Sequence, residues 1–212
     1  RAAIDAIVRL SATPAVQTQP YNMATYMREV QLLSEWYMPA MGLAFDSGAF
    51  DRMWAKALAP LSDYQRVTVL RDYHAENIML LGALHQQGLL DFQDALVGHP
   101  AYDLVSLLQD ARRDVAPALE VAMLDRYRRI TGADQAFVDA YHVLGAQRNA
   151  KIVGIFTRLD RRDGKPKYLA MIPRVWAAME RDLAHPALAP VARWFDANIP
   201  AALRAANGAF AA

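Results

Sequence analysis

The sequence contains no cysteine, and this absence excludes several kinds of chemistry. Disulfide bonds, thiolate nucleophiles and zinc sites with cysteine ligands cannot form in this chain. The 212 residues include five histidines, which also makes a zinc site of another composition improbable. We therefore expect the chemistry of this protein to rest on oxygen and nitrogen side chains, and the lack of cysteine fits a cytoplasmic location.

Long apolar runs and an excess of one charge are missing as well. No run of 18 apolar residues occurs, so we expect no membrane-spanning segment. The formal net charge is +1, and aromatic residues do not alternate with basic clusters as they do on nucleic-acid-binding surfaces. We expect neither a membrane nor a nucleic acid as partner.

Helical periodicity dominates the remaining sequence. Hydrophobic residues make up 54% of the chain and charged residues 21%, which allows a sizeable core. Apolar residues three or four positions apart predict a first helix that starts at Asn22 and stops at Pro39, and a second helix over 47–58. More helices are expected after Pro100, one of them ending at Gly132. The predicted fold is one mainly α-helical domain.

The segment 67–92 differs from the rest of the chain. The apolar runs "VTVL", "NIMLL" and "GLLDF" are short and predict strands. Gly82 and Gly88 bracket the turn between the last two runs. This predicts a small β-hairpin in the first half of the helical domain.

Three oxygen-bearing side chains are placed at the ends of these runs. Asp72 follows the first run, Asn77 opens the second, and Asp91 follows the third. A hairpin returns Asp91 toward Asn77, because antiparallel neighbours lie about 4.8 Å apart. Oxygen ligands suit Mg²⁺, and an Asp-x4-Asn pair followed by a strand-borne Asp is typical of kinase-type phosphoryl transfer. The alternative interpretation is that these are turn or cap residues of an ordinary hairpin.

These residues lie in motifs that resemble a known family. "LRDYHAENIMLL" and "GLLDFQDALVGHPAYDLVSLLQDARRDV" resemble the catalytic and metal-binding segments of the aminoglycoside phosphotransferase and choline kinase superfamily, which has a protein-kinase-like fold. More narrowly, "EWYMPA", "GAQRNAKIVGIFTRL" and "HPALAP" resemble bacterial kinases that phosphorylate the anomeric hydroxyl of N-acetylmuramate and N-acetylglucosamine in cell-wall recycling. The likeness covers about residues 20–199.

The resemblance implies a role for each matching residue. In the catalytic loop 70–77, Asp72 matches the catalytic acid and Asn77 a metal ligand. In the segment 91–94, Asp91 matches the second metal ligand, and Asp103 further on matches an acid that braces the loop. The implied cofactors are Mg²⁺ and ATP as phosphoryl donor. The sequence departs from the family at Leu70, where many relatives carry His, and at Gln93, which cannot supply a second charged ligand.

A small-molecule sugar is the implied substrate, and several polar or aromatic side chains are candidates to bind it. Trp36 can stack on a sugar face, Asp94 can approach the metal or the sugar, and His74 can orient Asp72 or contact the sugar. Further candidates for its hydroxyl or carboxylate groups are Glu35, Gln147, Arg148 and Asn149. The competing interpretations are a core aromatic for Trp36, a turn cap for Asp94 and a loop histidine bonded to backbone for His74.

An N-terminal nucleotide-binding lobe is not evident in the chain. Only some twenty residues precede the first predicted helix, without a Gly-rich loop or a strand-borne Lys, and the chain starts at Arg1 rather than Met. We therefore expect residues 1–212 to form the C-terminal lobe, with the N-terminal lobe of the same protein as its partner. We expect residues 1–212 by themselves to be inactive. The alternatives are an aminoglycoside or choline-type kinase, or a non-catalytic kinase-like binding domain.

Overall fold

The computed structural model describes residues 1–64, 66–82 and 86–205. The chain divides into two compact units, each made of two segments. The first contains residues 1–22 and 61–141, and the second contains residues 23–60 and 142–212. Helix α7 contributes its residues up to Tyr141 to the first unit.

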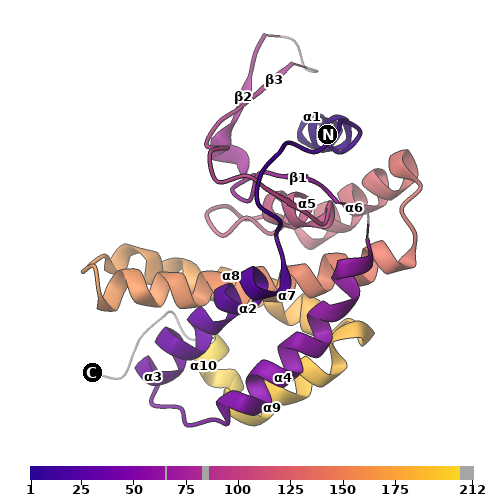
Figure 1. The fold of residues 1–212 in the computed structure, drawn as a ribbon. Helices are drawn as coiled ribbons and strands as arrows, with labels where there is room; N and C mark the ends of the chain where they lie inside the picture. Colours follow the sequence, from indigo (N-terminus) through magenta and orange to yellow (C-terminus); the bar gives the residue numbers. More distant parts are fainter. Residues whose placement is uncertain (65, 83–85, 206–212) are drawn as a thin grey trace. The chain divides into compact units, whose positions relative to one another are not determined.

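The first unit holds helices, short strands and 3-10 turns (Figure 1). Its elements are α1 (Ala2–Ser11), β1 (Val67–Val69), the 3-10 turn η3 (Ala75–Asn77), β2 (Ile78–Leu80), β3 (Gln87–Leu89), β4 (Leu96–Gly98), α5 (Ala101–Leu108) and α6 (Pro117–Thr131). Helix α1 packs against α5, α6 and β1. Helix α6 ends at Gly132, whose φ of 74° is a left-handed conformation that costs glycine little.

The strands form two separate antiparallel pairs. Strand β2 pairs with β3 so that Ile78 faces Leu89, and β1 pairs with β4 so that Val67 faces Gly98. The segment that follows α1 also runs beside β4, where the Tyr21 N–H donates to the Val97 carbonyl (2.8 Å). The polar loop that follows β1 and the hairpin β2–β3 are thereby held on one small framework.

The second unit is helical in the part that the structure describes. Its elements are α2 (Met23–Leu32), the π-helix η1 (Leu33–Tyr37), α3 (Met38–Ala40), α4 (Ser47–Leu58), most of α7 (Gln135–Arg161), the 3-10 turns η4 (Pro166–Met171) and η5 (Pro186–Leu188), α8 (Ile172–Leu183), α9 (Ala189–Asn198) and α10 (Ala201–Ala205). The 3-10 turn η2 (Ala59–Asp63) follows α4. Fully buried aromatic rings fill the core: Trp54, Trp176 and Phe195 meet edge to face, at centroid distances of 6.0 to 6.3 Å.

Two glycines let α7 approach its neighbours closely. A Cβ on Gly154 would overlap the backbone of Leu32 and Leu33, where α2 passes into the π-helix. A Cβ on Gly145 would overlap the carboxylate of Asp182 on α8. Both glycines lie inside a continuous helix, where glycine is otherwise unfavourable, so close packing accounts for them.

The predicted fold class is confirmed: the chain is mainly α-helical, with small antiparallel strand pairs. The second predicted helix has the expected bounds, Ser47–Leu58. The predicted stop at Pro39 is wrong, because helical structure continues to Ala40. Pro39 lies in the first turn of α3, where a missing N–H costs little. Part of the predicted turn between Gly82 and Gly88 lies outside the described residues, and Gly88 belongs to β3.

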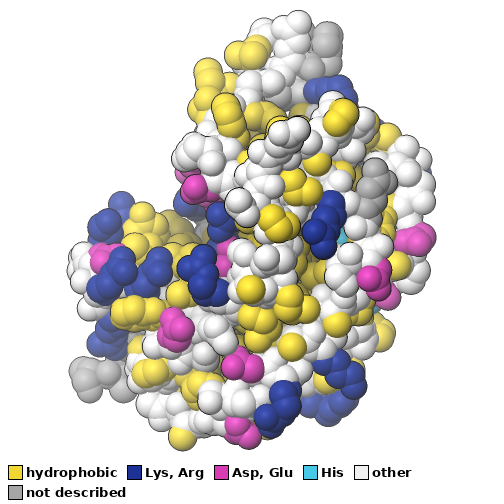
Figure 2. Space-filling model, viewed as in Figure 1, with side chains coloured by type: hydrophobic (Ala, Val, Ile, Leu, Met, Phe, Trp, Pro, Cys, Tyr) yellow, Lys and Arg dark blue, Asp and Glu magenta, His cyan; other side chains and the backbone are white. Residues whose placement is uncertain are grey.

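On the face in Figure 2, side chains of both charges are interspersed with apolar ones. Across the ranges that the structure describes, no helix is long and apolar enough to cross a bilayer.

Replacing Gly154 by Ala should destabilise the protein by about 3 kcal/mol, because the added methyl group would force α7 away from backbone atoms that cannot yield. Urea unfolding at equilibrium measures the change. The matched control is Gly48→Ala in the first turn of α4, where the nearest atom is the flexible end of Arg52 at 3.0 Å. That variant should change stability by less than about 1 kcal/mol, and equal losses in both variants would contradict the packing explanation.

Candidate active site

The loop after β1 presents Asp72 to solvent. Its backbone carbonyl accepts hydrogen bonds from the His74 N–H (3.1 Å) and from Asn77 Nδ2 (2.9 Å). In the described part of the chain, the Asp72 carboxylate itself has no hydrogen bond or ion pair. An exposed carboxylate on a folded loop is chemically able to accept a proton from a substrate hydroxyl.

The hairpin brings Asn77 and Asp91 together. Strands β2 and β3 are in register from Ile78–Leu89 onward, and the Leu90 N–H donates to the Asn77 carbonyl at 2.9 Å. Asn77 Nδ2 lies 3.5 Å from Asp91 Oδ2 while also donating to the Asp72 carbonyl. The three predicted residues therefore share one neighbourhood, as the hairpin register requires.

Gln93 holds the Asp91 carboxylate in place. Its Nε2 donates to Asp91 Oδ1 at 2.5 Å, which leaves Oδ2 facing Asn77. From the sequence, Gln93 appeared as the loss of a second charged ligand. The structure gives it a different use, and the signal that could have found it is the Asp-x-Gln spacing at the end of a strand.

The backbone is strained at two points of this site. Among the described residues, Arg71 (φ 71°) and Asp91 (φ 57°) are the non-glycine residues with positive φ. Such conformations cost of order 1 kcal/mol and persist where the surroundings impose them, often at functional sites. Both positions adjoin or carry a predicted active-site carboxylate, which supports a functional role for this loop.

Asp103 imposes the conformation at Arg71. It lies in the first turn of α5 with 3% of its surface exposed. Its Oδ2 accepts from the Leu70 N–H (2.7 Å) and its Oδ1 from the Arg71 N–H (2.9 Å). The structure thus places Asp103 against the two residues that precede Asp72, which is the position of a loop brace.

His74 is buried beside Asn77 rather than exposed toward a ligand. Its Nε2 lies 3.4 Å from Asn77 Nδ2. Burial lowers the pKa of the ring, the charge of Arg112 lowers it further, and the acids Asp110, Asp72 and Glu76 oppose the shift. The ring is therefore neutral at pH 7.

The donor set at this site fits a hard cation. Asn77 Oδ1 has no hydrogen bond in the part of the chain that the structure describes, and Asp91 supplies a carboxylate on the same side of the hairpin. Within those residues, no three His, Asp or Glu side chains are grouped to hold a metal ion. Mg²⁺ binds through one or two protein oxygen groups and completes its shell with water and phosphate oxygens, so Asn77 and Asp91 are a sufficient donor set for it.

The predicted sugar-binding residues lie elsewhere in the chain. Asp94 is exposed, three positions after Asp91. Glu35 is exposed and Trp36 half-buried, both in the π-helix of the second unit, and short π segments are frequent at functional sites.

On α7, Gln147, Arg148 and Asn149 are buried. Gln147 Nε2 donates to the Tyr26 carbonyl (3.2 Å), and Asn149 Nδ2 donates to Asp182 (3.3 Å). These contacts explain the burial of two of them, and contact with a sugar stays a prediction for all five residues of the second unit.

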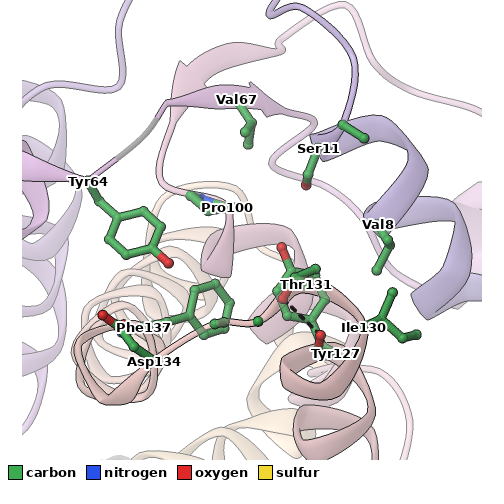
Figure 3. Close-up of a pocket in the computed structure, with 13 residues that line it drawn as sticks. Val8, Ser11, Tyr64, Val67, Pro100, Tyr127, Ile130, Thr131, Asp134 and Phe137 are labelled. Atoms are coloured by element: carbon green, nitrogen blue, oxygen red, sulfur yellow. Dashed lines mark hydrogen bonds between the residues drawn. The ribbon is translucent and has the colours of Figure 1, made fainter.

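A cavity in the first unit is separate from this cluster (Figure 3). Its volume is about 500 Å³, and the rings of Tyr64, Tyr127 and Phe137 form part of its wall. The predicted site residues are not among the residues that line it. The cavity therefore adds nothing to the assignment of the site.

The hairpin that carries the site exposes apolar side chains. Leu80 and Phe92 are 68% and 59% exposed, and Met79, Leu81 and Leu90 are also exposed. Contiguous exposed apolar residues mark surfaces that another part of a protein or a ligand covers.

Comparison with known proteins places the chain in a family. Residues 1–141 match the phosphotransferase enzyme family. The chain is 39% identical over 222 residues to an N-acetylmuramate/N-acetylglucosamine kinase of Caulobacter vibrioides, covering 96% of the chain and 61% of that protein. It is 34% identical over 196 residues to the Pseudomonas aeruginosa protein of the same name, covering 86% and 57%.

A third relative, from Neisseria meningitidis and also called N-acetylmuramate/N-acetylglucosamine kinase, is 38% identical over 167 residues, covering 73% of the chain and 49% of that protein. The chain thus spans about half to three fifths of the length of these relatives. The resemblance that the motifs around Asp72 and Asp91 predicted is confirmed at the level of the family. The chain belongs to the phosphotransferase enzyme family.

Proposed function

We propose that this chain is the catalytic lobe of an ATP-dependent kinase that phosphorylates the anomeric hydroxyl of N-acetylmuramate or N-acetylglucosamine in cell-wall recycling. The observation that carries the proposal is the convergence of Asp72, Asn77 and Asp91, with Asn77 Nδ2 bonded to the Asp72 carbonyl and 3.5 Å from Asp91. The choice of amino sugar rests on the names of the relatives.

In the proposed reaction, Asp72 accepts the proton of the sugar hydroxyl as that oxygen attacks the γ-phosphorus of ATP, the bond from this phosphorus to the β–γ bridging oxygen breaks, and ADP leaves. Asn77 Oδ1 and the Asp91 carboxylate would hold Mg²⁺, which would neutralise charge on the phosphate oxygens. Gln93 keeps the Asp91 carboxylate oriented, and Asp103 keeps the loop in the strained form that points Asp72 outward. Catalysis then comes mainly from positioning, as in other phosphoryl transfers.

We also propose that an N-terminal lobe of the same protein covers the exposed apolar side chains of the hairpin and contributes to nucleotide binding. The exposure of Leu80 and Phe92 supports this, and so does the fact that the relatives are longer than the chain. Within the second unit, Glu35, Trp36, Gln147, Arg148 and Asn149 stay candidates for sugar contacts, and Asp94 stays one in the first.

The substrate assignment is tested with the longest polypeptide that the reading frame encodes, supplied with ATP and Mg²⁺. We expect phosphorylation of N-acetylmuramate and N-acetylglucosamine, detected as acid-labile sugar 1-phosphate by ³¹P NMR. An aminoglycoside and choline are assayed in parallel. Faster turnover of an aminoglycoside or of choline would replace the proposed acceptor. If no ADP forms with any of the four compounds, a non-catalytic binding domain would be favoured.

Replacing Asp72 by Ala should lower kcat about 10²- to 10⁴-fold, because the proton acceptor is lost while the fold is kept. Steady-state kinetics on the same polypeptide measure the change. Asp63→Ala, which removes an exposed acid near the end of η2, is the matched control and should keep the wild-type rate. Near-normal kcat in the Asp72 variant would remove its catalytic assignment.

Asp91→Asn should raise the Mg²⁺ concentration that gives half-maximal rate by about tenfold or more, because a charged ligand becomes a neutral one. The rate is measured against free Mg²⁺ at saturating ATP and sugar. Thermal unfolding without Mg²⁺ serves as a check, since asparagine tolerates the left-handed φ of this position and should leave the melting temperature nearly unchanged. An unaltered Mg²⁺ dependence would argue against Asp91 as a ligand.

A further inference from the structure

Two buried polar side chains, His74 and Asp110, adjoin the proposed metal site. They are 5% and 4% exposed. His74 lies in the loop that carries Asp72. Asp110 lies just after the end of α5, the helix that has Asp103 in its first turn. Burial of a histidine and an acid is costly unless each finds a partner.

The chain after α5 lies against the loop of His74. Arg112 Nε is 3.7 Å from Glu76 Oε2. Glu76 lies two residues after His74, and Arg112 lies two residues after Asp110, so this contact joins the two segments. Besides burial and Arg112, the charge of Asp110 acts on the His74 ring and raises its pKa. The Arg112–Glu76 contact therefore places His74 and Asp110 on adjoining segments.

The contact with Asn77 favours one tautomer of His74. Asn77 Nδ2 is a donor, so it bonds His74 Nε2, 3.4 Å away, only in the tautomer whose Nε2 accepts. In the neutral ring, Nδ1 then carries the hydrogen. Nδ1 is buried, and among the described residues it has no hydrogen-bond partner.

Asp110 offers the complementary group. Its Oδ1 accepts from the Arg112 N–H at 2.8 Å and closes a local turn. Its Oδ2 is buried, and within the described ranges it has no donor. A buried N–H that needs an acceptor and a buried carboxylate oxygen that needs a donor thus occur in one neighbourhood.

We propose that Asp110 and His74 are positioning residues for Asn77. The Asp110 carboxylate pairs with His74 Nδ1–H, directly or through one water molecule, and so fixes the tautomer whose Nε2 accepts from Asn77 Nδ2. This keeps the Asn77 amide in the orientation that leaves Oδ1 free to bind a cation. Hydrogen bonds from neighbouring side chains commonly fix the orientation of metal ligands, and a water molecule can complete such a link.

The part of this inference that concerns the cation rests on the proposed function, whereas the tautomer of His74 does not. The competing explanation is that Asp110 closes the turn with Arg112 and has no influence on His74. Asp110→Asn separates the two, because asparagine closes the same turn and lacks the charge.

The tautomer is read from long-range ¹H–¹⁵N NMR spectra of the imidazole rings at pH 7, with the His74 signals assigned through His74→Gln. We expect wild-type His74 to carry its hydrogen on Nδ1, and Asp110→Asn to shift part of the population to the Nε2–H form. A wild-type ring protonated on Nε2, or an unchanged His74 signal in Asp110→Asn, would overturn the pairing.

The kinetic arm uses the kinase assay with Mg²⁺ varied. Asp110→Asn should raise the half-saturating Mg²⁺ concentration about tenfold, with a melting temperature close to wild type. Asp63→Asn is the matched control, since it removes an exposed acid outside this loop and should change neither reading. An active wild type with unaltered Mg²⁺ dependence in Asp110→Asn contradicts the positioning role. An inactive wild type instead contradicts the proposed function, and the NMR result still decides the pairing.

Discussion

The site depends on one carboxylate that is not itself exposed. The Asp103 carboxylate accepts hydrogen bonds from the N–H groups of Leu70 and Arg71. The first bond is buried and the second is partly buried. Arg71 is thereby held in a left-handed conformation that an arginine would not adopt by itself. The next residue is Asp72, so a side chain on α5 determines how the chain leaves β1. The hairpin residues then meet that loop through Asn77, whose side chain bonds the Asp72 carbonyl.

Much of this site could be predicted from the sequence, because side chains alternate between the two faces of a strand and a hairpin pairs its strands in a defined register. Once 77–81 and 88–92 are taken as paired strands, Asn77 and Asp91 have to lie at the same end. The register does not show what holds each carboxylate. Gln93 and Asp110 act through neighbours that are brought close by loops, and the sequence around them reads as a polar turn and a charged surface run.

Other elements of both units show where sequence patterns lose information. The bounds of α4 follow from its periodicity, whereas β4 consists of three residues and pairs with a strand nearly thirty positions earlier, so no local pattern predicts it. The sequence of α7 contains Gly145 and Gly154, but the reason for these glycines lies in the atoms of other helices that face them. The buried amides of Gln147 and Asn149 are likewise explained by partners on other helices, which the α7 sequence does not contain.

The π-helix over Leu33–Tyr37 has a consequence for the evolution of this chain. A π turn contains one residue more than the α turn it replaces, so it shifts every later residue by about 100° around the helix axis. Loss of a single residue within 33–37 would let the segment close into regular α-helix and turn Glu35 and Trp36 toward different surroundings. The same rotation would act on Tyr37 and Met38, which are fully buried, so the extra residue of the π turn is tied to the packing of the core as well as to the direction of Glu35 and Trp36.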